Sequence, residues 1–95
     1  MSISVIIPCY RAAATLRRAV DSALTGAPAD LEVLLVDDGS PDDTGTLCDE
    51  LAAADPRVSA LHRENGGAGA ARNTGLDAAH GDWALFLVCG PHWTP

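Results

Sequence analysis

The sequence predicts an α/β fold in which about four parallel strands form one sheet, with three helices in layers against its two faces. Short apolar runs rich in β-branched residues alternate with longer segments of helical periodicity. The runs are almost continuously apolar, as is typical of strands buried on both faces. This alternation indicates right-handed βαβ units, so ligands should bind beyond the carboxyl ends of the strands.

The first half of the chain is expected to supply two strands and two helices. Residues 2–8 (SISVIIP) predict the first strand, and the apolar stripe of residues 16–24 predicts an amphipathic helix. Residues 31–37 (LEVLLVD) predict the second strand. A second helix is expected from Ser40 to about residue 54, because serine can cap a first turn and the following proline suits the first helical position.

The second half repeats this alternation with shorter elements. Residues 58–62 predict a third strand, and a glycine-containing turn follows it. Residues 68–79, with small side chains on one face, predict a third helix, and residues 83–88 (WALFLV) predict a fourth strand. A chain of 95 residues can form one small domain with a single core.

Composition excludes several classes of protein. Thirteen acidic residues against six basic ones give a net charge of −7, which disfavours a nucleic-acid-binding module and an anionic membrane surface as partner. No apolar run is long enough to span a bilayer, and the first residues do not resemble a signal peptide. We therefore expect a cytoplasmic protein, with peripheral attachment at the inner face of the membrane left open.

The cysteines and histidines do not form a metal-binding pattern. Cys9, Cys48 and Cys89 are widely spaced and include no CxxC pair, so they are expected to be reduced thiols that pack like small apolar side chains. No group of cysteines and histidines has zinc spacing.

Polar and aromatic residues follow the first two predicted strands. Tyr10 follows the first strand, where it can stack on a planar ring or simply pack against the first helix. Asp37 and Asp38 follow the second strand, where carboxylates can accept a hydrogen bond from a nucleobase or ribose, or bind a cation. The alternative is that one aspartate supports the turn and the other is solvated.

A glycine-rich segment, residues 65–73 (NGGAGAARN), follows the third strand and enters the third helix. Its backbone N–H groups can approach an anion, and Arg72 can either hold a phosphate or neutralise the aspartate pair. The segment is neither a dinucleotide fingerprint nor a P-loop, since the last glycine of the former and the GK[ST] of the latter are absent. Tight helix–sheet packing is the alternative explanation for its small residues.

Together these segments resemble a known family. SVIIPxY, VDDGSxDxT, ENGGxxxARNxG and GDWxLFL occur in this order over residues 3–87, and the chain strongly resembles the start of the family 2 glycosyltransferases of GT-A fold. The resemblance implies that residues 1–87 form the nucleotide-diphospho-sugar-binding half of a GT-A domain, a Rossmann-like three-layer structure. It also implies the strand order 3-2-1-4, with the fourth strand at an edge.

The resemblance implies a nucleotide-binding set drawn from three loops, and a UDP-sugar as the ligand. Its members are Pro8, Tyr10, Asp37, Asp38, Gly67, Arg72 and Asn73. Tyr10 would lie against the base, in a loop shaped by Pro8, and Asp38 would contact the base, commonly uracil, with support from Asp37. One position departs from the family, because Arg11 stands where an asparagine is usual.

The last eight residues also depart from the family. An acidic D-x-D-D cluster that holds Mg²⁺ or Mn²⁺ usually follows the fourth strand, whereas residues 88–95 read VCGPHWTP, with no carboxylate. We therefore expect that this chain holds no metal and supplies no catalytic residue, because the family's DxD and catalytic base are both absent. It is expected to be a truncated donor-binding region with a non-family tail at residues 88–95, inactive alone. A natural short protein and a frameshifted gene both remain open.

Two other functions fit the fold class less well. A receiver-like signalling module would need an acidic pair after the first strand and a lysine, but the chain contains no lysine. A non-catalytic α/β interaction fragment is the second alternative. In that case the exposed edge of the fourth strand, which carries Trp83 and Phe86, is expected to promote self-association.

Overall fold

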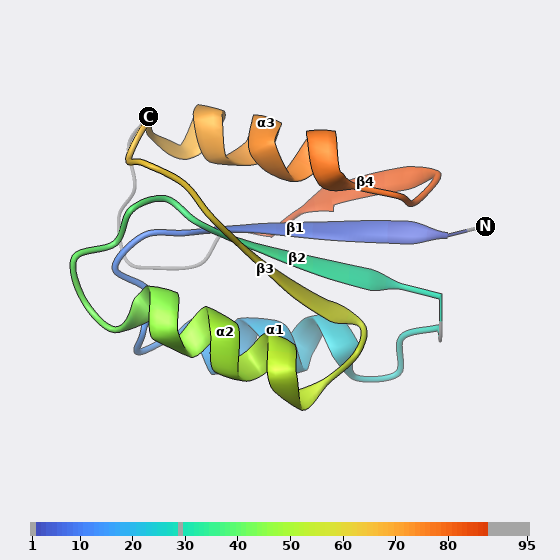
Figure 1. Cartoon of the computed structure of the whole chain (residues 1–95). Helices are drawn as coiled ribbons and strands as arrows, with labels where there is room; N and C mark the ends of the chain where they lie inside the picture. The colour runs from blue at the N-terminus through green and yellow to red at the C-terminus, as the bar shows by residue number, and fades with distance from the viewer. Residues whose placement is uncertain (1, 29, 88–95) are drawn as a thin grey trace.

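The computed structural model describes residues 2–28 and 30–87, in which strands and helices alternate (Figure 1). In chain order the elements are β1 (Ile3–Cys9), α1 (Leu16–Leu24), β2 (Glu32–Asp37), α2 (Thr44–Ala54), β3 (Val58–His62), α3 (Ala68–Ala78) and β4 (Trp83–Phe86). The strands are parallel and lie in the order β3-β2-β1-β4. The predicted α/β class and strand order are confirmed. The predictions made for residues 88–95, including Cys89, lie outside the described residues.

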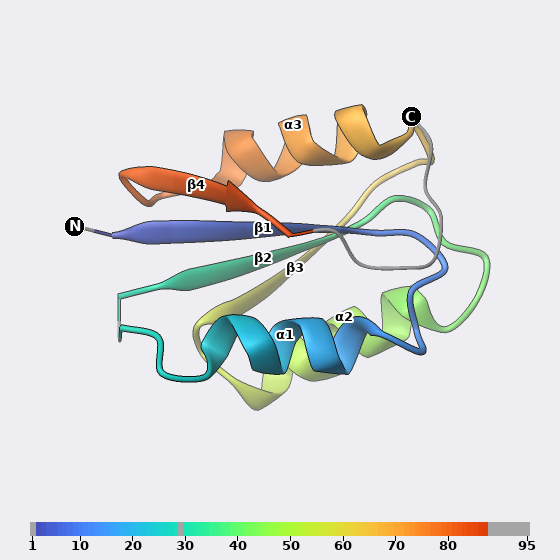
Figure 2. The same ribbon diagram turned by 180° about the vertical axis from the view of Figure 1, so that it is seen from behind.

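Helices cover both faces of the sheet. Helix α3 lies alone on one face, and α1 and α2 lie side by side on the other, as the two opposite views show (Figures 1 and 2). Successive side chains of a strand point to opposite faces, so β1 divides its residues between two apolar clusters. Val5 and Ile7 pack with the residues of α1 and α2, whereas Ile6 packs with Ala71 of α3.

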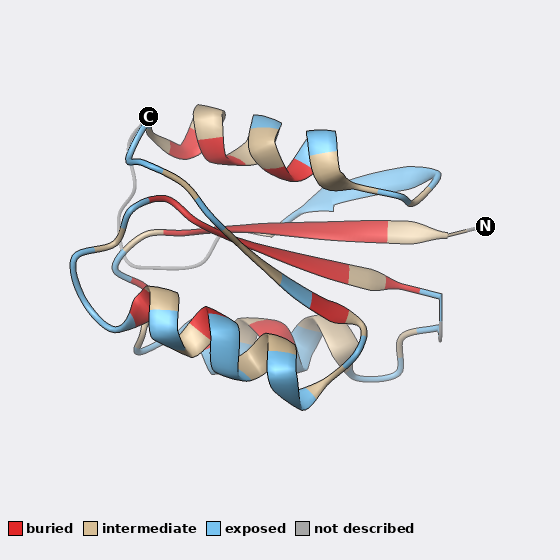
Figure 3. Cartoon of the chain, in the orientation of Figure 1, coloured by how far each residue is buried: buried red, intermediate tan, exposed pale blue. Residues whose placement is uncertain are grey.

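The two central strands are the most continuously buried elements. β1 and β2 are buried along nearly their whole lengths (Figure 3). Ile7 and Leu35 are fully buried, and each such side chain contributes roughly 1.5–3 kcal/mol through its removal from water. Cys9 and Cys48 are buried, in agreement with their predicted role as small apolar side chains.

Pro8 lies within central strand β1, where proline is unusual because it cannot donate a ladder hydrogen bond. On one side it pairs with Val36 of β2. On the other side the pairing of β1 with β4 ends at Ile6 and Phe86, two positions earlier. Over the described residues, therefore, no hydrogen bond between β1 and β4 requires an N–H at Pro8.

Helix α2 begins at Thr44, four residues later than predicted, and Ser40 does not cap it. The Ser40 hydroxyl accepts a hydrogen bond from the Arg11 N–H at 3.1 Å. Thr44 is buried instead, accepting the Ala12 N–H at 2.9 Å and donating to Asp42 at 2.6 Å. The predicted cap was wrong because Ser40 is used to join the loop after β2 to the loop after β1.

Strand β4 forms an exposed edge. Its residues include Trp83, Leu85 and Phe86, which are 58%, 55% and 46% exposed. Leu85 and Phe86 border a shallow groove with Val5 and Leu31. Among the described residues, no helix is both long enough and apolar enough to cross a membrane.

Candidate functional site

Three loops meet at the carboxyl ends of β1, β2 and β3, on the left in Figure 1. Backbone hydrogen bonds join them directly. The Asp38 N–H donates to the carbonyl of Cys9 at 2.9 Å, and the Arg63 N–H donates to the carbonyl of Asp37 at 3.0 Å. The predicted loops are therefore brought together at one edge of the sheet, as the parallel topology requires.

The Asp38 carboxylate organises the glycine-rich loop. It is fully buried, and it accepts hydrogen bonds from the N–H groups of Gly66 at 3.0 Å and Gly67 at 2.9 Å. Its remaining charge is paired with Arg63, whose Nε lies 3.1 Å from Oδ1. Gly67 has a φ of 93°, a conformation that other residues rarely adopt. Asp38 thus fixes the backbone that leads into α3.

Asp37 supports the loop that follows β2. Its Oδ1 accepts the N–H of Ser40 at 3.1 Å, and its Oδ2 lies 3.1 Å from His62 Nδ1. The other ring nitrogen of His62 lies 2.8 Å from Asp49 Oδ1. Hydrogen bonds with Asp49 and then Asp37 raise the pKa of His62 above its usual value. The His62 ring therefore links the end of β3 to β2 and α2.

Because the His62 pKa is raised, the histidine should make stability depend on pH. Its contribution is fully present below the unfolded-state pKa of about 6.5 and is lost as the pH rises through the higher folded-state value. The ring is 45% exposed, so the contribution is expected to be only about 0.5 kcal/mol, a few degrees in Tm.

Thermal melts at about pH 6 and about pH 8.5 measure this contribution. His62→Gln should lower Tm at the lower pH and have little effect at the higher one. The other histidines are common to both proteins, so the difference between the two melts isolates His62. An equal loss at both pH values would contradict the charged pair.

The structure assigns charge neutralisation to Arg63, not to Arg72. Sequence reasoning did not single out Arg63, nor Asn65, whose side-chain amide donates to the Asp38 carbonyl at 3.0 Å. A signal was present, since β3 ends at His62 and is followed by Arg63, just as β2 ends at Asp37 and is followed by Asp38. Only the folded structure shows that His62 contacts Asp37 and Arg63 contacts Asp38.

The other predicted site residues lie around Asp37 and Asp38 and differ in how far they are buried. Pro8 is buried in β1, and Tyr10 is half-buried just beyond that strand. Within α3, Arg72 is half-buried and Asn73 is exposed. Neither of these two side chains forms a hydrogen bond or ion pair within the described part of the chain.

Arg11, the departure from the family pattern, has an unusual backbone. Its φ is 51°, in the left-handed region that asparagine tolerates better than most residues. The N–H of Arg11 is held by Ser40, and its guanidinium lies 5.5 Å from the centre of the Tyr10 ring. The arginine therefore accepts backbone strain at this position and makes a cation–π contact with Tyr10.

The described residues do not fit a divalent metal. Over residues 2–28 and 30–87 there is no group of three or more histidines, cysteines or carboxylates that could hold one. The two aspartates at the site are already engaged by Arg63, His62 and backbone N–H groups. Mg²⁺ and Mn²⁺ prefer several free oxygen ligands, and Asp37 and Asp38 do not offer them.

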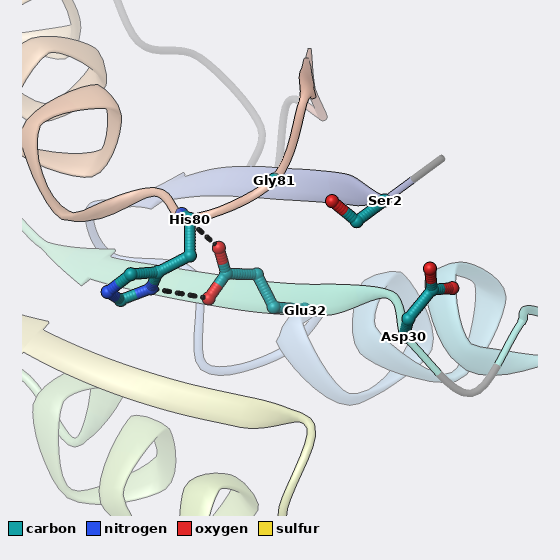
Figure 4. A pocket seen from close by; sticks show the side chains of 5 residues that line it. All are labelled: Ser2, Asp30, Glu32, His80 and Gly81. Atoms are coloured by element: carbon teal, nitrogen blue, oxygen red, sulfur yellow. Dashed lines mark hydrogen bonds and ion pairs between the residues drawn. The ribbon is translucent and has the colours of Figure 1, made fainter.

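A second cluster lies at the opposite, amino-terminal end of the strands (Figure 4). Glu32 accepts the Ser4 hydroxyl at 2.6 Å and faces His80 Nδ1 at 3.3 Å. Burial alone would raise the pKa of Glu32, but the hydrogen bonds from Ser4 and His80 outweigh it and lower the pKa. Because Ser4 Oγ also accepts the Gly81 N–H, the cluster fastens the turn before β4 and is best explained as structural.

Comparison with known proteins identifies the family. The sequence model of the family described as glycosyl transferase family 2 matches residues 4–87. The chain belongs to glycosyl transferase family 2. One relative, the uncharacterized glycosyltransferase EpsJ of Bacillus subtilis, is 38% identical over 85 residues, or 90% of this chain. The chain spans 25% of the length of EpsJ.

Solved structures agree with the family 2 assignment. The crystal structure of S. aureus TarS 1-349 in complex with UDP-GlcNAc is 29% identical to this chain, with a TM-score of 0.79 over 93% of this chain and 26% of that one. The mannosyltransferase PcManGT from Pyrobaculum calidifontis, in complex with GDP-Man and Mn²⁺, is 28% identical, with a TM-score of 0.68 over 84% of this chain and 25% of that one. The fold matches the N-terminal part of GT-A glycosyltransferases.

Proposed function

We propose that this chain is the donor-binding region of a glycosyltransferase and binds a nucleoside-diphospho-sugar, with a UDP-sugar as the favoured ligand. The ligand would lie at the carboxyl ends of β1–β3, between the loop that contains Tyr10 and the start of α3. The TarS complex with UDP-GlcNAc supports this choice. So does Tyr10, since an aromatic ring beside a pocket can stack on a base.

The main support for the proposal is that Arg72 has no carboxylate partner among the described residues. Arg63 neutralises Asp38, and Arg72 has no carboxylate partner within the described residues, although it is half-buried in α3. A guanidinium at the start of a helix, beside a glycine-rich loop, is well suited to bind a diphosphate. Of the two roles suggested by the sequence, phosphate binding is therefore the one we propose for Arg72.

Four further residues belong to the proposed site and have different roles. They are Asp37, Asp38, Gly67 and Asn73. Asp38 is fully engaged by the loop N–H groups and by Arg63, so its role is to hold the loop, and it reaches a base only if that loop moves. Asp37 supports the same loop through Ser40. Asn73 is exposed on α3, where it is available to a ligand.

The chain alone is proposed to bind the donor without transferring the sugar. Its described residues provide neither a metal-ligand set nor a carboxylate free to act as general base at the site. Binding should therefore change little on addition of EDTA or Mn²⁺. A reducing compartment such as the cytoplasm belongs to the same proposal, and the buried free thiol of Cys48 supports it.

Isothermal titration calorimetry with UDP tests the proposal. The folded chain should bind UDP, and uridine should bind more weakly because it lacks the diphosphate. Arg72→Met is expected to weaken UDP binding about tenfold or more, the typical effect of losing a charge-assisted hydrogen bond.

Arg18→Met is the matched control, because Arg18 is exposed on α1, on the other side of the sheet from α3. UDP affinity unchanged by Arg72→Met would contradict the assigned role. A folded chain that binds none of UDP, CDP or GDP would overturn the donor-binding function itself.

We further propose that the β4 edge pairs with a second copy of the chain. Trp83, Leu85 and Phe86 are exposed there, and the strand carries no charge, which favours edge-to-edge pairing. Sedimentation velocity should detect a dimer whose population rises with concentration and falls in Leu85→Lys. A monomer at all concentrations would refute the pairing.

A further inference from the structure

Arg63 makes more side-chain contacts at the site than charge neutralisation requires. Its Nε lies 3.1 Å from Asp38 Oδ1 and also donates to the carbonyl of Glu64 at 3.0 Å. Its Nη1 donates to the carbonyl of Ala70 at 3.0 Å and to the Thr74 hydroxyl at 2.6 Å. One guanidinium therefore contacts the loop after β2, its own loop after β3, and helix α3.

Two of the Arg63 contacts are on α3, the helix that carries Arg72, which is the residue proposed to bind phosphate. Ala70 and Thr74 are one helical turn apart, and Arg72 lies between them in sequence. The Thr74 hydroxyl also donates to the Ala70 carbonyl at 3.1 Å. Arg63 thus holds the first turns of the helix that carries Arg72 against the buried carboxylate of Asp38.

We infer that Arg63 is a positioning residue for the donor site, setting where α3 and the glycine-rich loop stand relative to β2. The inference rests on the proposed nucleotide-binding function and adds to it a residue that acts through Asp38, Ala70 and Thr74. Arg63 is partly shielded, with its side chain 29% exposed, and its Nε and Nη1 donors are already used. Its effect on the ligand is therefore indirect.

Lysine cannot replace arginine in this role. A planar guanidinium presents several donors in a fixed arrangement, whereas an ammonium is a compact point charge on a flexible stem. A lysine at position 63 keeps a positive charge near Asp38 but cannot hold Asp38, Ala70 and Thr74 together. Arg63→Lys consequently separates charge neutralisation from positioning.

The test uses two variants and one control in the 95-residue chain, with UDP as the probe. Arg63→Lys is expected to weaken UDP binding by about tenfold while the melting curve stays cooperative. Thr74→Val removes one partner of Arg63 without touching Asp38, and should weaken UDP binding by about threefold. Arg57→Met is the control, because Arg57 pairs with Asp55 at 3.0 Å at the start of β3, far from the loop.

Two readouts separate positioning from general stability. UDP affinity comes from calorimetry, and the backbone amide signals of residues 66–73 come from ¹H–¹⁵N spectra recorded without ligand. Both should change in Arg63→Lys and Thr74→Val, and neither should change in Arg57→Met. If Arg63→Lys fails to fold at the measuring temperature, Thr74→Val decides the question.

The possible results distinguish the two proposals. If the wild-type chain binds UDP and both variants bind it as tightly as wild type, the positioning role is overturned and the donor site stands. If affinity falls equally in the Arg57→Met control, the effect is one of stability, which also overturns the role. If the folded wild-type chain binds no nucleotide, the proposed function fails, and the role of Arg63 fails with it.

Discussion

Asp38→Asn is expected to destabilise the fold more than any other polar substitution at the site. The carboxylate is fully buried, accepts the N–H groups of Gly66 and Gly67, and pairs with Arg63. An asparagine leaves Arg63 without its counter-charge and turns either an amide NH₂ or a single oxygen toward these donors. Removing one partner of a buried pair typically costs about 3–5 kcal/mol.

Such a loss is a large share of the total stability of a chain this short. A domain of about this size has roughly 5–15 kcal/mol of stability, and each kcal/mol shifts Tm by about 4–8 °C. Thermal unfolding followed by circular dichroism should therefore show Asp38→Asn melting at least about 12 °C below wild type.

Asp55→Asn is the matched control for Asp38→Asn. It also removes an aspartate paired with an arginine, but Asp55 and Arg57 are partly exposed, so water can replace the lost contacts. Its Tm should fall much less. If the two variants melt at the same temperature, the Asp38 carboxylate does not bear the charge and hydrogen bonds described for it.

The double variant Asp38→Asn/Arg63→Met measures the coupling between the two side chains. Removing both charges leaves no unpaired ion, so the double variant should lose less stability than the sum of the single variants. UDP binding should still be weak in it, because the link from Arg63 to Ala70 and Thr74 is also gone. Full recovery of UDP binding would mean that charge neutralisation is the whole role of Arg63.

The strands could be predicted almost to the residue because their sequence signal is local. β-Branched apolar runs bounded by turn residues give β1, β2 and β3 within one residue of their observed limits. The start of α2 could not be predicted in this way. Ser40 has the composition of a cap, but the chain folds so that the Arg11 N–H lies within its reach, and no local pattern encodes that distance.

The site could be predicted in outline but not in its pairings. Ligand loops at the carboxyl ends of parallel strands follow from topology alone, which is why Asp37, Asp38 and Gly67 lie together. Whether Arg63 or Arg72 pairs with Asp38 depends on how the residue after β3 and the start of α3 are placed beside the end of β2. That placement is a property of the folded structure, whereas the sequence pattern had suggested only Arg72.

Two glycine-to-alanine substitutions in α3 are expected to change stability in opposite directions. At Gly75 an added Cβ would clash with Cγ2 of Ile6 and lie 3.2 Å from its Cγ1. Ile6 is fully buried on β1 and has no room to withdraw. Overpacking of this kind typically costs about 1–3 kcal/mol. Most of this range lies above the gain of about 1 kcal/mol that comes from replacing a helical glycine.

At Gly69, in the first turn of the same helix, an added Cβ meets nothing within 4 Å. Only the helix propensity should then change, so Gly69→Ala should stabilise the chain by up to about 1 kcal/mol. Urea unfolding of both variants measures this difference in stability. The comparison is matched, because both variants are glycine-to-alanine substitutions in the same helix. Gly75→Ala should unfold at a lower urea concentration than wild type, and Gly69→Ala at a higher one.

Ile6→Ala combined with Gly75→Ala isolates the contact between α3 and β1. Ile6→Ala alone leaves a cavity and should cost about 2–5 kcal/mol, whereas the alanine methyl at position 75 partly fills that cavity in the double variant. The double variant should therefore lose less stability than the sum of the losses in the two single variants. If Gly75→Ala instead stabilises the chain as Gly69→Ala does, α3 lies farther from β1 than described. Arg72, which α3 carries, would then be wrongly placed relative to the donor site.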